Sequence, residues 1–192
     1  MTKLASVSQI RIIAGEWRGR KIPVPEIQGL RPTPDRIRET LFNWLSSDCR
    51  GAVVLDCFAG SGVLGFETSS RAAKSVTLIE KDKAGWENLK TQAQRLGATN
   101  IDVLCGDVLD LIPQLQQSYS LVFIDPPYAL PELRQKVLES LLAHKKLTDG
   151  ARIYLEWPQG ESFELPSADF QWLKKKKAGS VHYAIAEWCL SR

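Results

Sequence analysis

From Gly51 onward, short apolar runs alternate with longer amphipathic stretches, and this rhythm restricts the fold more than any other feature of the sequence. The runs are rich in Val, Ile and Leu, as buried parallel strands are, and they cover residues 52–58, 75–80, 101–105, 120–125 and 151–157. Residues 81–97 and 131–147 carry apolar side chains at helical spacing. The sequence therefore predicts an α/β fold with a doubly wound, mostly parallel sheet.

The two ends of the chain depart from this rhythm. Residues 170–179 and 180–191 are strand-like and predict an antiparallel hairpin at the sheet edge. Residues 11–25 predict a second, small hairpin with Gly19 near its turn, followed by a helix that Thr33 or Asp35 could cap. We expect residues 1–30 to form a basic, RNA-binding appendage and residues 31–192 to form the main domain.

Composition narrows the class of protein. The chain has 192 residues, of which 44% are hydrophobic, enough for one substantial core. No apolar run approaches the roughly 18 residues that cross a bilayer, so we expect a cytoplasmic protein without membrane contact. Cys49, Cys57, Cys105 and Cys189 lack C-x-x-C spacing, and with two histidines in the chain they argue against a zinc site. Cys57 and Cys105 lie in apolar runs and are predicted to be buried thiols.

Positive charge concentrates near the N-terminus. Residues 11–38 carry seven Arg or Lys side chains with Trp17 and several glycines among them, a mixture that suits contact with a nucleic-acid backbone. An ordinary solvated hairpin is the alternative. Lys174 to Lys177 could also contact RNA, but a charged edge strand that prevents aggregation explains them equally well, and no site is assigned there.

Acids and glycines follow three of the predicted strands. Gly60 and Gly62 come after the first strand, Glu80 ends the second, and Asp107 follows the third. In a parallel sheet these positions meet at one rim, where ligands bind. The loop lacks the G-x-G-x-x-G register that a dinucleotide needs, whereas S-adenosylmethionine has no phosphate and carries an amino group for Asp56 and a ribose for Glu80. Each acid taken singly could be a helix cap or a solvated group.

The fourth strand ends in Asp125, Pro126, Pro127 and Tyr128. The prolines stiffen the corner, and the Asp125 carboxylate and the Pro126 carbonyl are two acceptors for the hydrogens of a nucleobase amine. Tyr128 offers a face on which the base can stack. Guanine presents two adjacent donors and suits these acceptors modestly better than adenine does. A Pro-Pro loop that merely ends a strand would explain neither the acid nor the aromatic ring.

These motifs, DCFAGSG, IEKD, GD and FIDPPY, together with RIIAGEWRGRKI and RPTPDRIRETLFNWL, resemble the bacterial 16S ribosomal RNA guanine-N2 methyltransferase D family over nearly the whole chain. The resemblance implies a class I methyltransferase fold with a seven-stranded sheet and S-adenosylmethionine as donor, with S-adenosylhomocysteine as product and no metal. The implied target is the N2 amine of one guanine, guanine 966, of 16S rRNA in a partly assembled small subunit. A monomer is expected.

The resemblance also assigns residues by position. The base site would comprise Asp125, Pro126, Pro127 and Tyr128. The cofactor site would comprise Asp56, Phe58, Ala59, Gly60, Ser61, Gly62, Glu80, Lys81, Asp107, Val108 and Asp125. RNA contacts would come from Arg11, Arg18, Arg20, Arg31, Thr33 and Arg36.

Three other activities compete with this interpretation. A DNA adenine-N6 methyltransferase shares the Asp125 corner but usually needs an additional recognition region, for which about 30 residues leave little room. A protein glutamine methyltransferase more typically carries Asn in place of Asp125. A non-catalytic ribosome-assembly factor could keep the fold and bind RNA without methylating it.

Overall fold

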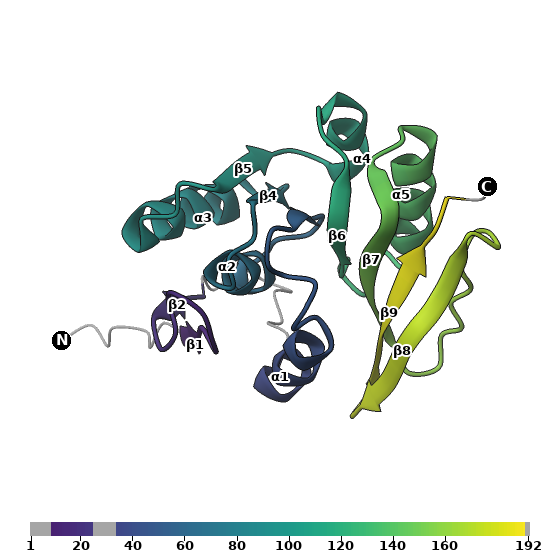
Figure 1. Ribbon diagram of the computed structural model, residues 1–192, viewed down its shortest axis with the longest axis horizontal. Helices are drawn as coiled ribbons and strands as arrows, with labels where there is room; N and C mark the ends of the chain where they lie inside the picture. Colours follow the sequence, from purple (N-terminus) through teal and green to yellow (C-terminus); the bar gives the residue numbers. More distant parts are fainter. Residues whose placement is uncertain (1–8, 25–33, 191–192) are drawn as a thin grey trace.

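The computed structural model describes residues 9–24 and 34–190, and its centre is a seven-stranded sheet (Figure 1). In spatial order the strands are β5 (Ile101–Cys105), β4 (Ser75–Glu80), β3 (Val53–Asp56), β6 (Tyr119–Ile124), β7 (Leu147–Pro158), β9 (Val181–Trp188) and β8 (Phe170–Ala178). The first five are parallel, and β9 runs antiparallel to both of its neighbours. The predicted mostly parallel sheet with an antiparallel C-terminal hairpin is confirmed.

Helices cover both faces of this sheet. One face carries α1 (Asp35–Trp44), α2 (Val63–Ser70) and α3 (Lys83–Leu96), and the other carries α4 (Val108–Leu111), the 3-10 helix η1 (Ile112–Gln114) and α5 (Glu132–Ala143) (Figure 1). The apolar residues that pointed to helices form the two halves of the core, one on each face. Gly97 ends α3 in the left-handed conformation at φ 70°, which glycine adopts readily.

The start of α1 differs from the prediction. Pro34 occupies the N-cap position, and no side chain caps the helix. Asp35 is already the first helical residue, and its carboxylate instead pairs with Arg38 at 2.6 Å. Thr33 lies outside the described residues. Asp35 still places a negative charge in the first turn, where it opposes the positive end of the helix dipole.

The small N-terminal hairpin pairs β1 (Gln9–Arg11) with β2 (Lys21–Pro23) and packs onto α2. Its Ile12 and Trp17 are buried in the same core as α1 and α2, and all eight residues of α2 are buried. The division expected at residue 30 falls within residues 25–33, outside the described residues, and stays a prediction.

The four cysteines are free thiols. Cys57 is buried as predicted, but the prediction for Cys105 was wrong because that side chain is exposed. Cys105 belongs to β5, one of the two edge strands of the sheet, so an apolar run there does not place every side chain in the core. Among the described residues, no helix has the length and apolar character of a membrane span, and no group of three His, Cys, Asp or Glu side chains could hold a metal ion.

Candidate active site

A cavity of about 730 Å³ opens at the carboxyl ends of the central strands. It lies where the strand order reverses between β3 and β6, the place at which doubly wound sheets bind their ligands. Its walls come from the loops after β3, β4, β5 and β6, from the N-terminal end of α1, and from the turn between β8 and β9. Segments distant in sequence are therefore brought together in one site.

Two of the predicted acids organise the part of the cavity beside β4 and β5. Glu80 accepts hydrogen bonds from the backbone N–H of Gly60 at 2.9 Å and of Asp82 at 2.8 Å. Asp107 caps α4 through the N–H of Leu109 at 3.0 Å. Each carboxylate oxygen has a second lone pair, so both acids can hold backbone in place and still accept from the hydroxyl or amine groups of a ligand.

Lys81 forms an ion pair with Asp107 at 2.9 Å on this side of the cavity. The hydrogen bond from Lys81 and the N–H of Leu109 hold the pKa of Asp107 below its usual value. Asp107 is therefore ionised at neutral pH. Its Oδ1 and Oδ2 are both engaged, which makes it an acceptor of fixed orientation.

Asp56 ends β3 deep in the cavity and is almost fully buried. Burial raises the pKa of Asp56 to about 7, against hydrogen bonds from the backbone of Phe58 and Gly65 that lower it, and the nearby charge of Glu80 raises it further. A buried acid with this pKa ionises most readily when a cation lies beside it. Asp56 thus favours a positively charged group of a ligand.

The glycine loop from Phe58 to Ser61 lines the cavity, but Gly62 does not. Gly62 is the N-cap of α2 with φ 74°, and a Cβ there would lie 2.4 Å from the side chain of Leu89. Its role in this structure is to let the helix begin and to pack against α3. The cofactor contact predicted for Gly62 is therefore not among the cavity walls.

The Asp125 corner lies at the end of β6, beside an acid that the sequence analysis missed. Glu156 of β7 is buried, lines the cavity and accepts a hydrogen bond from the hydroxyl of Tyr154. Ile124 pairs with Leu155 in the parallel register, so the next residues, Asp125 and Glu156, follow on adjacent strands. The sequence signal that could have identified Glu156 was the presence of an acid within the predicted apolar run 151–157.

Burial raises the pKa of Asp125 well above its usual value. The charges of Glu156 and Asp56 raise it further, and the charge of Arg134 opposes them. A raised pKa makes the carboxylate of Asp125 a stronger base than the carboxylate of an exposed aspartate.

The mouth of the cavity is apolar and stiff. Pro126 is buried and Pro127 exposed, and the carbonyl of Pro127 accepts from the N–H of Leu130 at 2.9 Å. Tyr128 and Leu130 are among the few large apolar side chains exposed in the described residues, and both line the cavity. A flat aromatic group could enter here and lie against the ring of Tyr128.

The cavity wall is predominantly acidic. Its acids are Asp56, Glu80, Asp107, Asp125 and Glu156, and its bases are Arg36 and Lys81. Because Lys81 already pairs with Asp107, the interior suits a cationic ligand and would repel a pyrophosphate.

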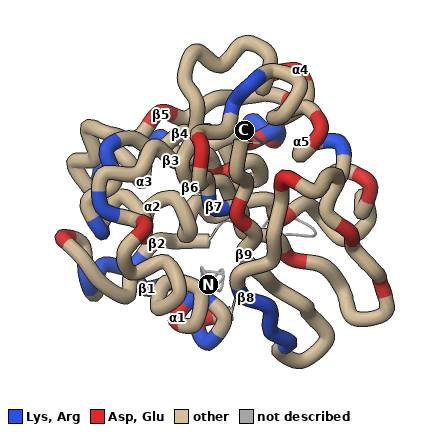
Figure 2. The backbone as a smooth tube through the Cα atoms, turned by 45° about the vertical axis from the view of Figure 1, so that its right-hand side comes forward, with Lys and Arg blue, Asp and Glu red and all other residues tan. Residues whose placement is uncertain are grey.

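The candidate RNA-binding residues lie outside this acidic interior. Arg36 lines the mouth from the first turn of α1. Arg11, Arg18 and Arg20 are exposed on the N-terminal hairpin and are not part of the cavity wall. Arg31 and Thr33 lie outside the described residues. Figure 2 marks the Lys and Arg positions of the hairpin and of α1 in blue.

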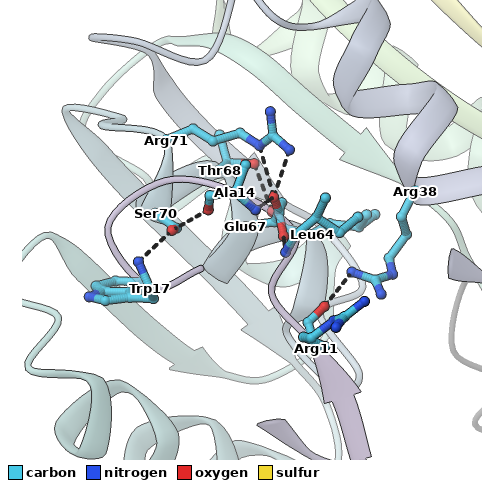
Figure 3. Close-up of polar contacts among 10 residues, drawn as sticks. Arg11, Ala14, Trp17, Arg38, Leu64, Glu67, Thr68, Ser70 and Arg71 are labelled. Atoms are coloured by element: carbon cyan, nitrogen blue, oxygen red, sulfur yellow. Dashed lines mark hydrogen bonds and ion pairs between the residues drawn. The ribbon is translucent and has the colours of Figure 1, made fainter. Parts of the chain in front are cut away.

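The hairpin is fastened to α2 by a buried polar clasp (Figure 3). Glu67 accepts from the backbone N–H of Ile13 at 2.7 Å and of Ala14 at 3.0 Å, and it pairs with Arg71 at 2.8 Å. Ser70 Oγ accepts from the Trp17 N–H at 2.9 Å and donates to the Ala14 carbonyl at 2.6 Å. The basic hairpin is consequently held in a set position relative to the cavity.

Gly15 allows this close approach. It has φ 83°, and a Cβ at this position would lie 1.8 Å from the carbonyl oxygen of Ser70. A side chain at residue 15 would push the hairpin away from α2. The clasp thus needs glycine for both its conformation and its contact.

The turn between β8 and β9 also forms part of the cavity wall, through residues 178–181. No site was predicted in this hairpin, since a charged edge strand explains its lysines equally well. Its position against α1 depends on tertiary packing. Trp44 of α1 stacks on Tyr183 of β9 with the ring centroids 5.3 Å apart.

Known proteins match this chain over most of its length. A family model described as conserved hypothetical protein 95 matches residues 10–187. The chain is 42% identical over 177 residues to the ribosomal RNA small subunit methyltransferase D of Escherichia coli K12, covering 92% of this chain and 89% of that protein. The protein of the same name from Haemophilus influenzae is 41% identical over 181 residues, which cover 92% of this chain and 93% of that one.

Solved structures share the fold. One from Escherichia coli has a TM-score of 0.88 at 38% identity and covers 96% of this chain and 100% of that chain. An rRNA methylase from Streptococcus thermophilus has a TM-score of 0.65 at 13% identity, with 82% of this chain and 99% of that chain covered. The expected class I methyltransferase fold is therefore confirmed.

Proposed function

This chain belongs to the ribosomal RNA small subunit methyltransferase D family, and from this membership we propose that it transfers a methyl group from S-adenosylmethionine to the exocyclic N2 amine of a guanine in 16S rRNA. The observation that carries the proposal is the pairing of an acidic donor cavity with the Asp125 corner at its mouth. The family resemblance that the sequence motifs indicated is confirmed.

The cavity fits the donor by charge and by hydrogen bonding. S-adenosylmethionine supplies an electrophilic methyl group on a sulfonium, and it also carries an ammonium. Asp56 is the acceptor for the ammonium, and Glu80 is the acceptor for the ribose hydroxyls. Asp107 and the backbone of Val108, which also line the cavity, would hold the adenine. The two positive charges would offset the mutual repulsion of the buried acids.

The Asp125 corner aligns the target amine. The lone pair of a nucleobase amine is delocalised into the ring, so the amine is a weak nucleophile. The Asp125 carboxylate and the Pro126 carbonyl accept hydrogen bonds from the two N–H groups of the amine. These bonds direct the lone pair of the nitrogen toward the methyl carbon, while Tyr128 stacks on the base. A new N–C bond forms as the S–C bond breaks, and the nitrogen gives its surplus proton to Asp125.

Guanine fits this arrangement through its neighbouring N1–H donor. Adenine carries an acceptor at N1. An ionised carboxylate is also an acceptor, so the two groups could not form a hydrogen bond. Glu156, adjacent to Asp125 on β7, extends the acidic surface along which the two guanine donors could lie. We further predict that the RNA is met in a partly assembled small subunit and that the protein acts as a monomer.

Replacing Asp125 with Ala tests the role of the corner. We expect Asp125→Ala to bind S-adenosylmethionine almost as the unmodified protein does, yet to lose at least about a hundredfold in methyl transfer to small-subunit rRNA, the scale of a lost acid–base group. The measurement is incorporation of labelled methyl. Asp102→Ala, which removes an exposed carboxylate from β5, is the matched control.

The product identifies the base. Digestion of the methylated RNA and mass spectrometry should show N2-methylguanosine. Appearance of N6-methyladenosine, or transfer to duplex DNA in preference to rRNA, would favour an adenine methyltransferase. Binding of RNA with no transfer in the unmodified protein would indicate an assembly factor, and undiminished transfer by Asp125→Ala would refute the mechanism.

A further inference from the structure

The lysines of β8 divide between the two faces of the sheet. Lys174 pairs with Ile185 and Lys176 with Tyr183 in the antiparallel register of β8 and β9. Directly opposed residues point to the same face. Since Ile185 and Tyr183 belong to the core beneath α1 and α2, Lys174 and Lys176 project on the side of the sheet that carries α1.

Lys175 and Lys177 project to the other face. They pair with Ala184 and His182, which pack on the side that carries α5. The ammonium of Lys175 lies 4.8 Å from the ring centroid of Trp172 and 5.3 Å from that of Trp157. The run of four lysines therefore contains one pair on each face, and Lys175 of the second pair already contacts aromatic rings.

Lys174 and Lys176 lack acidic partners in the part of the chain that the structure describes. Several other basic side chains pair with a carboxylate: Lys81 with Asp107, Arg134 with Glu161, and Arg152 with Glu187. Within residues 9–24 and 34–190, neither Lys174 nor Lys176 has a carboxylate within ion-pair distance. Their charge is available to an external anion.

These two lysines lie across α1 from the N-terminal hairpin. Arg38 of α1 donates to the Arg11 carbonyl of the hairpin at 3.2 Å, and Trp44 of the same helix stacks on Tyr183 of β9. Both views show α1 between the hairpin and the β8 end of the sheet (Figures 1 and 2). β8 also ends at Ala178, in the cavity wall, two residues after Lys176.

We propose that Lys174 and Lys176 form a second RNA-binding surface, which contacts phosphates on the side of the target nucleotide opposite the N-terminal hairpin. The inference rests on the proposed function, because it takes RNA as the substrate that enters the cavity. The hairpin arginines lie on one side of α1, Arg36 lies at the cavity mouth, and the lysine pair lies on the other side. An RNA strand that places its base in the cavity would then be held on both flanks.

Protection of an edge strand is the competing explanation for these charges. β8 is the outer strand of the sheet, and lysines on an edge discourage pairing with another chain. That explanation predicts no difference between the two pairs, because both lie on the same strand. The proposed surface predicts that only the pair on the α1 face affects RNA binding.

The experiment compares two double variants of equal charge. Lys174→Gln/Lys176→Gln removes the pair on the α1 face, and Lys175→Gln/Lys177→Gln is the matched control. The probe is transcribed small-subunit rRNA, and its affinity is measured from 50 to 200 mM salt. Loss of two single-strand phosphate contacts should reduce the salt slope by about 1.4 and the affinity at 0.1 M salt by about 25-fold in the first variant only.

Further readouts separate the outcomes. Thermal melting and light scattering report folding and aggregation of both variants, and donor binding should be unchanged in both. Equal affinity and slope for the two variants would overturn the proposal, as would a defect seen on ribosomal particles but absent on naked RNA, which would indicate a protein contact. Failure of the unmodified protein to methylate guanine would overturn the proposed function while leaving the lysine surface supported by the binding data.

Discussion

At the residue scale, the cavity acids Asp56, Asp125 and Glu156 have an electrostatic cost when no cation is present. Asp56 and Asp125 both have raised pKa values, for which burial is the main cause, and Glu156 adds to the rise at Asp125. A protein that only needed a stable core would place apolar side chains here. These acids therefore indicate selection for ligand binding and chemistry at the expense of stability.

The raised pKa of Asp56 predicts a stability gain on neutralisation. The pKa of this carboxyl is about 7 in the folded state and 3.8 in the unfolded state, so the folded protein binds the proton more tightly. Its contribution to the free energy of unfolding therefore falls as pH rises from about 4 to 7. Asp56→Asn removes this loss. Relative to the unmodified protein, its free energy of unfolding should rise by up to about 3 kcal/mol more at pH 8 than at pH 5.

Urea unfolding at the two pH values measures this difference, and Asp102→Asn on the exposed face of β5 is the control. Asp56→Asn should at the same time bind S-adenosylmethionine more weakly. A stability difference that does not change with pH would show that Asp56 is not the group responsible.

A second residue-scale prediction concerns Glu156. Its charge helps to raise the pKa of Asp125, so Glu156→Gln should lower that pKa. If Asp125 acts as the ionised acceptor of the amine, the acid limb of the profile of kcat against pH should move to lower pH. Methyl transfer measured from pH 5 to 9 checks this, with the exposed Glu164→Gln as control. An acid limb that stays in place would separate Glu156 from the function of Asp125.

At the element scale, the N-terminal hairpin is part of the core and is held by named polar contacts. It buries apolar side chains against α1 and α2, and its backbone N–H groups are satisfied by Glu67 and Ser70. The clasp gives the arginines of the hairpin a set distance from the cavity mouth. The RNA binding proposed for the hairpin would thereby be coupled to the proposed positioning of the base through α2, which contributes no basic side chain within its bounds.

Removing one member of the clasp should loosen the hairpin selectively. Ser70→Ala leaves the backbone N–H of Trp17 without its acceptor. The free energy of unfolding should fall by about 1–3 kcal/mol. Hydrogen exchange of the amides in residues 12–20 should become about tenfold faster or more, while exchange in β3 and β6 stays slow. Ser69→Ala is the matched control, since Ser69 lies next to it on α2 but bonds Asn100 instead. Equal acceleration in both variants would argue against the clasp.

At the scale of the whole molecule, the parallel half of the fold followed from the sequence, and the acids at its strand ends followed with it. Glu80, Asp107 and Asp125 could be placed at one rim because parallel strands share a direction. Glu156 was missed because a lone acid inside an apolar run has no periodic signal, and its neighbour Asp125 comes from a different strand. The local pattern of apolar and polar residues does not indicate which strands lie side by side in the sheet.

The remaining errors have the same physical origin. Cys105 was expected to be buried, but edge position, which depends on the strand order, leaves it exposed. The contribution of residues 178–181 to the cavity depends on the packing of Trp44 against Tyr183, a contact between segments about 140 residues apart. Contacts between segments distant in the sequence determine both the exposure of Cys105 and the place of residues 178–181 in the cavity wall.

The position of β9 has a consequence for biosynthesis. β9 lies between β7 and β8 although it is made after both, so the sheet has to admit its last-made strand at an interior place. Residues 178–181 are also the last of the cavity wall to leave the translating ribosome. A nascent chain can therefore have its donor-side loops complete while the wall beside the mouth is still missing, and it acquires a finished pocket only when this late hairpin has been released and has folded.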